Sequence, residues 1–544
     1  MRSMPRLALP SALFALVAAP LAQAQAVTWQ VVAGKSASLD LPGFPAGSRS
    51  YSDILLADGG GALIGLRMTV PSAAQGYWAR REGSWQRHAA TGVSGATLGP
   101  GRVGGEAGHV FLAIDGGGND AAVDGQRVFV ARAGDPANTV GATRGIWRWN
   151  TQQNIEVARV QDDGALGPGL GANAVFNGNA FAEVRMAAAG RVLINADVRL
   201  PDTSDHRVLA RHVPGQGNVP CAMRGSTDPA LAPGLSAGDS FDTSWTLASV
   251  ALAASGRAYG TFSTSGSRSG IWEVCNGAPH ALVADDVSDA LGPEIGVATA
   301  SFVDGSFGTA RPGEDGRFYF SARYRLANGQ SSASGLFWHD GVANRPLALN
   351  DAAAVYGPHW LDATWTTFNT VSLMGAGRWA AFAATARTSG GTSVDGLWRV
   401  EAGGSPRPVA LVGASGDYAP ETGRTWTTFL ATAVFANGAI LLHARTNPNA
   451  EEALWLLEPG QAPRRVLVAG QVVAVPTTSG VVQDTVQSFS IDTGYAQYGA
   501  GADGWAGADG SALVEATLSS QGDVRLLGAV TRAQDLLFRN GFDP

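Results

Sequence analysis

A serine inside a glycine-rich pentapeptide is the first feature of this sequence that could do chemistry. Gly234-Leu235-Ser236-Ala237-Gly238 matches the G-x-S-x-G pattern of a nucleophile elbow. That elbow works on a sharp strand-to-helix turn, with a histidine and an acid placed later in the chain. Here the pentapeptide follows Pro233 in a loop that recurs along the sequence, and no helical pattern comes after it. We therefore expect no catalytic serine at this position.

The histidines, cysteines and acidic residues form no recognised catalytic or zinc-binding motif. The eight histidines are scattered, and only His206 and His212 flank one strand, six residues apart. Zinc sites need paired Cys or His ligands at short spacing, and the sequence has no such pairs. The adjacent acids are expected to lie in or beside turns and to face solvent; they are Asp162-Asp163, Asp285-Asp286 and Glu451-Glu452. The sequence therefore assigns no catalytic residue, no cofactor and no zinc.

One glycine- and aspartate-rich segment resembles a calcium-binding turn. Asp115-Gly116-Gly117-Gly118-Asn119-Asp120 is followed closely by Asp124. Calcium takes six or more oxygen ligands, and Gly/Asp repeats supply them only by stacking several copies. A single copy favours a polar hairpin loop. The alternative is a weak calcium site at Asp115, Asp120 and Asp124.

Aromatic side chains in two loops are the candidates for ligand contacts. Tyr356, His359 and Trp360 surround one loop proline, and Tyr418 lies in the corresponding loop of the next copy of a repeat. Aromatic rings on loops can pack on sugar rings or on peptides. The sequence thus suggests a glycan- or peptide-binding platform at these four residues. The alternative is that they are partly buried against the neighbouring repeat.

A repeat of about sixty residues organises the whole chain, because proline, glycine and tryptophan recur with it. The loop prolines are Pro42, Pro100, Pro168, Pro233, Pro293, Pro358, Pro420 and Pro476, and glycine follows four of them. The turn glycines are Gly61, Gly125, Gly190, Gly256, Gly316, Gly377, Gly438 and Gly510. Each repeat contains four short apolar stretches. In six copies the fourth stretch carries a tryptophan that we expect to pack between repeats; these are Trp78, Trp147, Trp272, Trp338, Trp398 and Trp455.

Each repeat predicts four short antiparallel strands, because runs of four to eight residues rich in Val, Leu, Phe and Trp are bounded by Gly, Pro, Asn and Asp. Repeated four-stranded sheets that cover one another predict an all-β fold, a single β-propeller of about eight blades. Seven blades remain the alternative if the segment from Tyr495 to Asp509 is an insertion. The strand from Trp29 to Gly34 is expected to complete the sheet formed by Gly510 to Val530 and so close the ring.

The third and fourth stretches resemble the N-x-x-G-x-x-A-F tandem repeats of exported bacterial proteins. Gly316-Arg317-Phe318-Tyr319-Phe320 and Gly377-Arg378-Trp379-Ala380-Ala381-Phe382 keep the glycine and the apolar pair of that pattern. The copies depart from it at the first position, since Asn437 is not placed there. The resemblance covers nearly all of the chain after its N-terminal segment. It implies an exported β-propeller-like repeat protein, with no activity that carries over.

Residues 1–26 read as a signal peptide, which places the remainder outside the cytoplasm, in the periplasm, at the cell surface or secreted. Arg2 and Arg6 precede a short apolar stretch that ends near two Ala-x-Ala sites. The propeller is predicted over residues 27–530, with a C-terminal tail at 531–544. Cys221 and Cys275 lie in adjacent repeats and form either one disulfide or two buried thiols. No later segment is long and apolar enough to span a membrane.

Composition narrows the classes of function. The net charge of −7, with 15% charged and 45% hydrophobic residues, predicts a folded chain and gives no reason to expect nucleic acid. We expect a monomer that does not act as an enzyme and binds a glycan or a protein through its loop face. The alternative is a polysaccharide lyase or glycosidase whose acid and base come from different repeats and meet at a central channel.

Overall fold

The computed structural model describes most of the chain as β-structure. The described residues are 27–44, 50–57, 63–69, 75–81, 83–121, 125–242, 250–253, 256–287, 290–313, 316–327, 331–350, 354–491 and 510–531. Within them there is no α-helix, so none could cross a bilayer, and four 3-10 turns occur: η1 (Gly104–Glu106), η2 (Ala188–Gly190), η4 (Ala354–Tyr356) and η5 (Gly416–Tyr418). The predicted signal peptide and, beyond residue 531, the predicted tail lie outside the described residues.

The strands form eight antiparallel sheets in the described part of the chain, numbered here in chain order. Sheet 1 contains β2 (Ser50–Ala57), β3 (Leu63–Thr69), β4 (Gln75–Arg81) and β5 (Ser84–Ala90). Sheet 2 contains β6 (Val110–Ala121), β7 (Arg127–Asp135), β8 (Asn138–Trp149) and β9 (Asn154–Arg159). Sheet 3 contains β10 (Val175–Ala187), β11 (Arg191–Arg199), β12 (Asp205–Val213) and β13 (Gly217–Met223). Sheet 4 contains β14 (Val250–Leu252), β15 (Ala258–Ser263), β16 (Ser269–Val274) and β17 (His280–Ala284).

The second half of the chain repeats this plan with small variations. Sheet 5 contains β18 (Ser301–Phe302), β19 (Arg311–Pro312), β20 (Phe318–Arg325), β21 (Ala333–His339) and β22 (Asn344–Leu349). Sheet 6 contains β23 (Thr364–Ala376), β24 (Trp379–Arg387), β25 (Ser393–Glu401) and β26 (Arg407–Leu411). Sheet 7 contains β27 (Thr425–Val434), β28 (Ile440–Asn447), β29 (Glu451–Leu457) and β30 (Arg464–Val468). Sheet 8 contains β31 (Val472–Thr477), β32 (Gly480–Ser490), β33 (Ser511–Leu518), β34 (Gly522–Ala529) and β1 (Gln30–Gly34).

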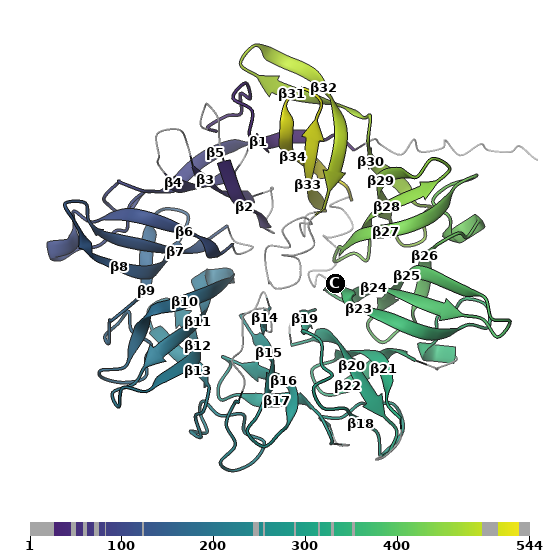
Figure 1. The fold of residues 1–544 in the computed structure, drawn as a ribbon, viewed down its shortest axis with the longest axis horizontal. Coiled ribbons are helices and arrows are strands. Elements are labelled where there is room, and N and C mark those ends of the chain that lie inside the picture. The colour runs from purple at the N-terminus through teal and green to yellow at the C-terminus, as the bar shows by residue number, and fades with distance from the viewer. Residues whose placement is uncertain are drawn as a thin grey trace, which may run out of the picture.

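The sheets follow one another around a common centre (Figure 1), and sheets 3 and 4 each place their first strand, β10 or β14, innermost. The first strands of neighbouring sheets are in contact: β6 contacts β10, and β23 contacts β27. Apolar residues between neighbouring sheets form the core. One cluster, for example, joins Val128 and Ile146 of sheet 2 to Val184 and Ile194 of sheet 3. Each sheet thus covers a face of the next.

The two ends of the described chain meet in sheet 8. β1 pairs antiparallel with β34, and Gln30 lies opposite Leu527. The predicted pairing of the N-terminal strand with the C-terminal repeat is confirmed. Sheet 8 has a fifth strand, β31, at its edge. Pro476 lies in this strand, although a loop was predicted there. An edge strand tolerates proline, because its missing backbone donor is not needed for pairing. The segment from Tyr495 to Asp509, which bears on the seven-blade alternative, lies outside the described residues.

A hydrogen bond explains why tryptophan and proline recur together. The indole Nε1 of Trp147 donates to the carbonyl oxygen of Pro100 at 3.0 Å, and Trp272 binds Pro233 in the same way at 2.9 Å. In sheet 5 the predicted residue, Trp338, is one position too late. The register places Phe337 opposite Pro346, as Trp398 of sheet 6 lies opposite Pro408. The extra residue turns Trp338 to the other face of its strand.

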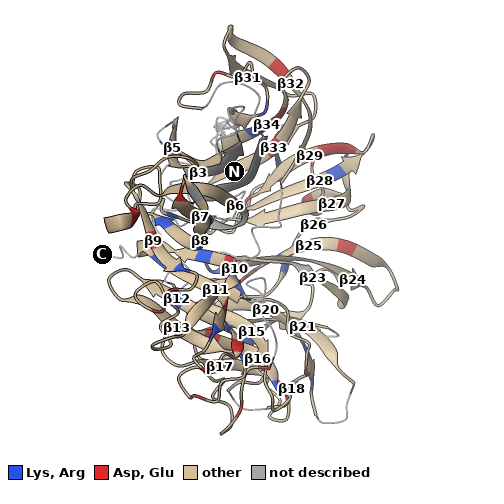
Figure 2. Cartoon of the chain, turned by 60° about the vertical axis from the view of Figure 1, so that its left-hand side comes forward, with Lys and Arg blue, Asp and Glu red and all other residues tan. Residues whose placement is uncertain are grey.

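Two further contacts clamp neighbouring sheets. Cys221 on β13 and Cys275, just after β16, form a disulfide with an S–S distance of 2.12 Å. The buried Asn344 amide donates to the carbonyl oxygens of Leu282 and Leu291 in the preceding repeat, at 3.0 and 3.1 Å. Charged residues are dispersed over the strands (Figure 2). The covalent and polar contacts therefore reinforce the apolar core between sheets.

Candidate functional site

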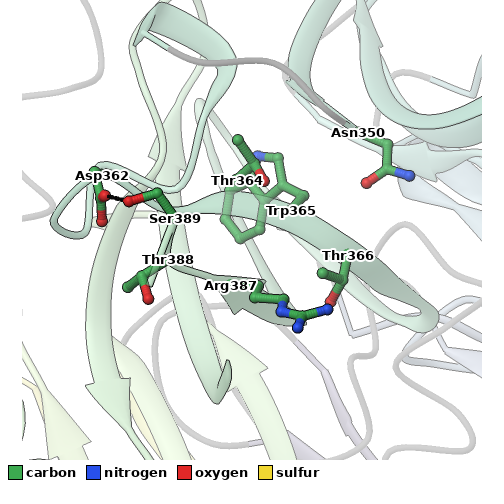
Figure 3. Close-up of a pocket in the computed structure, with 8 residues that line it drawn as sticks. All are labelled: Asn350, Asp362, Thr364, Trp365, Thr366, Arg387, Thr388 and Ser389. Carbon is green, nitrogen blue, oxygen red and sulfur yellow. Dashed lines mark hydrogen bonds between the residues drawn. The ribbon is translucent and has the colours of Figure 1, made fainter. Parts of the chain in front are cut away.

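A polar pocket of about 350 Å³ lies between sheets 5 and 6 (Figure 3). Its lining residues come from the position after β22, from the loop before β23 and the start of that strand, and from the end of β24 and the turn after it. They are Asn350, Asp362, Thr364, Trp365, Thr366, Arg387, Thr388 and Ser389. Pockets of about 300–1,000 Å³ hold small ligands in known proteins.

Strand pairing fixes the walls of this pocket. Thr364 at the start of β23 lies opposite Arg387 at the end of β24, so the two side chains enter the pocket from adjacent strands. Asn350 arrives from the preceding sheet, and Figure 3 shows it on the side opposite Asp362 and Ser389. Side chains held on paired strands keep their positions better than side chains on loops alone.

Trp365 is the apolar wall and is completely buried. Its ring packs against Trp398 at 4.7 Å, Phe368 at 5.3 Å and Phe382 at 5.5 Å between centroids. Its Nε1 donates to the Tyr356 carbonyl oxygen at 2.7 Å. Trp365 therefore belongs to the core between sheets 5 and 6. Because the ring is enclosed, Trp365 anchors the loop and presents no free stacking face.

Three polar groups remain available to a ligand. Asn350 Oδ1 is buried and has no hydrogen-bond partner among the described residues. Asp362 accepts a hydrogen bond from Ser389 Oγ, which holds the pKa of this exposed carboxyl below its ordinary value. Arg387 is exposed, and no salt bridge joins it to a carboxylate in the described ranges. The pocket thus has acceptors on two opposite walls, at Asn350 and Asp362, and a cation at Arg387.

The four aromatic candidates lie close to this pocket or one repeat beyond it. Tyr356, His359 and Trp360 share the loop 354–363, and Tyr418 lies in the loop before β27. Tyr356, Trp360 and Tyr418 are half-buried against the cores between sheets. This partial burial agrees with the alternative interpretation of the sequence, in which these residues pack against the neighbouring repeat. His359 is exposed, with Nε2 3.3 Å from the Val355 carbonyl oxygen.

His359 has a backbone conformation that other copies of the loop give to glycine. The residue after the loop proline has a φ of 71° at Gly43, 64° at Gly101, 73° at Gly169 and 72° at Gly234. His359 follows Pro358 with a φ of 48°. Glycine adopts positive φ without steric cost, whereas other residues pay for it. The repeat therefore does not require a side chain at this position.

Leu361, two residues later, is also in the left-handed region, with a φ of 51°. Its side chain is 79% exposed, and that of Val355 in the same loop is 54% exposed. Strained residues with exposed side chains are a recurrent property of binding sites. The loop 354–363 thus presents apolar and imidazole groups beside a polar pocket.

Sequence reasoning missed the three polar residues Asn350, Asp362 and Arg387. For Arg387, a comparison between repeats gives part of the answer, because the residue paired with the arginine differs between sheets. In sheet 3, Arg199 lies opposite Asp205, whereas Arg387 lies opposite Ser393. Recognising that difference requires the strand register, which the sequence alone did not supply.

The calcium alternative gains no support from Asp115, whose carboxylate binds Arg144 Nη2 at 2.7 Å. The expected hairpin loop is wrong, because the segment from Asp115 to Asp120 lies inside β6 and bulges between Ile114 and Asn119. Asp124 and the Asp120 side chain lie outside the described residues. The described ranges contain no cluster of three or more metal-ligating side chains.

The expectation that the adjacent acids face solvent is wrong for Asp285, which is completely buried. Its Oδ2 accepts from Ser269 N and Oγ, both at 3.0 Å, and Ser269 Oγ also lies 2.9 Å from Asp304 Oδ1. Burial raises the pKa of Asp285 to about 6. Asp285 follows β17 and bridges to Phe302 of the next sheet, so the sheet junction covers it.

Known structures with similar backbones are distant. A puromycin-hydrolyzing peptidase of Mycobacterium tuberculosis is 12% identical over 81% of this chain, with a TM-score of 0.27, and this chain spans 56% of its length. A triple arginine-to-alanine mutant of AofleA from Arthrobotrys oligospora is 11% identical, with a TM-score of 0.22 over 69% of this chain and 88% of that one. A protein of unknown function from Dyadobacter fermentans is 10% identical, with a TM-score of 0.22 over 67% and 96% of the two chains. TM-scores this low do not define a common fold.

Sequence comparison gives one positive result. None of the curated proteins matches the chain. The resemblance to N-x-x-G-x-x-A-F repeats stays a prediction. A family profile matches residues 61–508, which is most of the sequence. The chain therefore belongs to the DUF7453 family, a family of unknown function.

Proposed function

We propose that the protein is an exported β-propeller with eight blades and a ring closed by β1. Eight antiparallel sheets in the described residues, their succession around one centre, and the pairing of β1 with β34 support this architecture. A closed ring leaves no long open sheet edge, which protects the chain from edge-to-edge aggregation. The N-terminal segment 1–26 and the Cys221–Cys275 disulfide fit export.

We further propose that it binds a glycan, without catalysis, at the pocket between sheets 5 and 6. The observation that carries this proposal is the positive φ of His359, at a position that four other copies fill with glycine. A non-glycine residue in this region costs roughly 1–3 kcal/mol. The repeat folds with glycine there, and in this copy the side chain kept against that cost is exposed on the loop that carries Asp362 of the pocket lining.

The chemistry of the pocket suits a sugar. Hydroxyl groups need acceptors such as Asn350 Oδ1 and the Asp362 carboxylate, and the apolar face of a sugar ring packs on exposed apolar side chains. Leu361 and Val355 expose such a surface on the loop 354–363, which also carries Asp362 of the pocket lining. One small site thus combines both kinds of contact.

The alternative of a lyase or glycosidase requires two ionisable groups tuned for proton transfer at a substrate. Asp285 has the raised pKa of a general acid but is enclosed at a sheet junction. Asp362 is exposed to a ligand, but its pKa is lowered, so it stays ionised and accepts hydrogen bonds. These properties favour binding over turnover.

A glycan array probed with the mature protein, together with turnover assays on every glycan that binds, tests the proposal. We expect binding to a defined set of glycans, weakened at least tenfold by Asn350→Ala, and no product from any of them. Asn350→Ala is chosen because its Oδ1 has no structural partner in the described chain. Product formation that depends on Asp362 would establish the enzyme alternative instead. The absence of glycan binding would refute the proposal.

A further inference from the structure

We propose that one proton, shared between two carboxyl groups through a serine, holds a loop tip of sheet 5 on sheet 4 and that its loss releases the tip. The tip consists of Asp304 and Gly305, between β18 and β19. It contacts Ser269 at the start of β16, and Ser269 also contacts Asp285. We call these four residues the latch. The latch lies outside the pocket and does not depend on the proposed function.

The hydrogen bonds around Ser269 require one more hydrogen than its hydroxyl group supplies. Ser269 Oγ lies 3.0 Å from Asp285 Oδ2 and 2.9 Å from Asp304 Oδ1, and it accepts a hydrogen bond from Gly305 N at 2.7 Å. A hydroxyl group has one hydrogen, and an ionised carboxylate has none to donate. Both carboxyl contacts are therefore hydrogen bonds only when one of the two acids is protonated.

The proton belongs on Asp285. Its side chain is completely buried, and its Oδ1 has no hydrogen-bond partner among the described residues, whereas Asp304 is exposed. Burying an ionised carboxylate is costly, and a bound proton removes that cost. Burial, together with hydrogen bonding to Asp304 and the charge of Asp304, raises the pKa of Asp285 to about 6. Protonated Asp285 then donates to Ser269 Oγ, which donates to Asp304.

The cations near Asp285 do not replace this proton. Arg268 Nη1 donates to the backbone oxygen of Asp285 at 2.8 Å but lies 4.0 Å from its Oδ1. Asp286 adds a negative charge beside Asp285 and is paired with Arg325 of β20. Arg323 of the same strand binds a serine hydroxyl. The carboxyl group of Asp285 thus depends on Ser269 and on its own protonation.

Loss of the proton opens the latch at Asp304. Ionised, buried Asp285 keeps the hydroxyl hydrogen of Ser269 and the backbone N–H of Ser269, which lies 3.0 Å from Oδ2. Asp304 then faces an oxygen without a hydrogen and a like charge, and both favour its move into solvent. Because the pKa of Asp285 is raised from 3.8 to about 6, the latch is complete below about pH 4 and lost as the pH rises through about 6.

Hydrogen exchange of a peptide that contains Gly305 tests the latch between pH 4 and pH 8. Exchange times are scaled to the intrinsic rate at each pH, and EDTA is present so that no divalent cation bridges the acids. The proteins are wild type, Asp304→Asn, Asp304→Ala and Asp242→Asn. Asp242 is an exposed aspartate in the loop before sheet 4, with no described contact to the latch, and serves as the matched control. Peptides of sheet 7 report whether any variant unfolds as a whole.

We expect wild type and Asp242→Asn to lose protection at Gly305 at least tenfold from pH 4 to pH 8, with a midpoint near pH 6, while sheet 7 stays protected. The displaced pKa of Asp285 allows a change of up to about a hundredfold. Asp304→Asn should stay protected at pH 8, because its amide supplies the missing hydrogen, and Asp304→Ala should exchange rapidly throughout. Protection that is independent of pH in wild type, equal loss in Asp304→Asn, or a loss that extends to sheet 7 would overturn the proposal.

Discussion

The indole nitrogen of Trp398 donates a hydrogen bond to the carbonyl oxygen of Pro358, at 2.9 Å. Trp398 belongs to the third main strand of sheet 6, and Pro358 directly precedes His359 in the loop beside the pocket. The Trp398 ring also packs edge-to-face on Trp365, with centroids 4.7 Å apart. One residue of the repeat core therefore holds both the wall of the pocket and its loop.

Trp398→Phe should destabilise the fold by about 1–3 kcal/mol, because it leaves the Pro358 carbonyl oxygen without its donor. Trp455 has the same position in sheet 7, but its buried Nε1 has no hydrogen-bond partner among the described atoms. Trp455→Phe is therefore the matched control and should cost less, since it weakens ring contacts, including that with Arg465, but breaks no hydrogen bond in the described structure. Urea unfolding measures both. An equal loss of stability for the two variants would show that the Pro358 hydrogen bond contributes nothing.

Asp285 should make stability fall as pH rises from about 4 to about 6. Its pKa in the folded protein, about 6, exceeds the ordinary value of 3.8, so the native state binds more protons than the unfolded state between these values. Stability from this group is complete below about pH 4 and lost above about pH 6. Asp285→Asn mimics the protonated form and should gain stability relative to wild type as pH rises.

The measurement is the difference in urea unfolding free energy between Asp285→Asn and wild type at pH 4, 5, 6 and 7. Asp286→Asn is the neighbouring control, because Asp286 pairs with Arg325 and faces solvent. A difference that stays constant with pH for Asp285→Asn would contradict the protonated, buried state of this carboxyl.

Asp484 should have the opposite dependence on pH. Its carboxylate accepts hydrogen bonds from Ser519 Oγ, from Ser520 Oγ at 2.7 Å, and from the backbone N–H groups of Thr485 at 2.8 Å and Ser520 at 3.1 Å. These donors lower the pKa of Asp484 to about 2. The stability that it contributes is present above about pH 4 and lost as pH falls toward 2. Asp484→Asn should cost about 1–2 kcal/mol at pH 7. Acid unfolding monitored by circular dichroism checks this, and an unchanged acid midpoint in the variant would contradict it.

The Cys221–Cys275 disulfide should stabilise the junction of sheets 3 and 4. It closes a loop over a sequence separation of 54 residues. In the chain-entropy account, a loop of this size contributes at most about 4 kcal/mol. The double variant Cys221→Ser/Cys275→Ser should unfold at lower urea than the oxidised wild type. If reduction by dithiothreitol leaves the urea midpoint of wild type unchanged, the disulfide does not stabilise the fold.

Most of the strand pattern could be predicted because glycine, proline and tryptophan recur at fixed steps. The turn glycines and the Gly-x-Trp steps placed the strands, and the match of Trp29 to Gly34 with a final strand predicted its pairing with β34. Local chemistry determines these features. Pro476 was misplaced because an edge strand tolerates a proline, and Trp338 because one residue of register changes the face of a strand.

The candidate site was predicted only in part, since it depends on contacts between repeats. The sequence pointed to the loop with Tyr356, His359 and Trp360, but not to Arg387 or Asn350. Arg387 is notable only when the residue opposite it, Ser393, is known. Likewise, nothing in the Asp285-Asp286 pair reveals which acid the next sheet covers. Such properties arise from strand register and packing, which a single sequence does not display.

His359→Gly tests the central claim most directly, because it restores the residue that four other loops have. The variant should be more stable in urea by about 1 kcal/mol, since glycine relieves the positive-φ strain. It should also bind the glycan selected on the array at least fivefold more weakly by calorimetry. Gly169→Ala, in a loop remote from the pocket, should lose stability and leave glycan affinity unchanged. A His359→Gly protein that gains stability and keeps full glycan affinity would contradict a functional role for this loop.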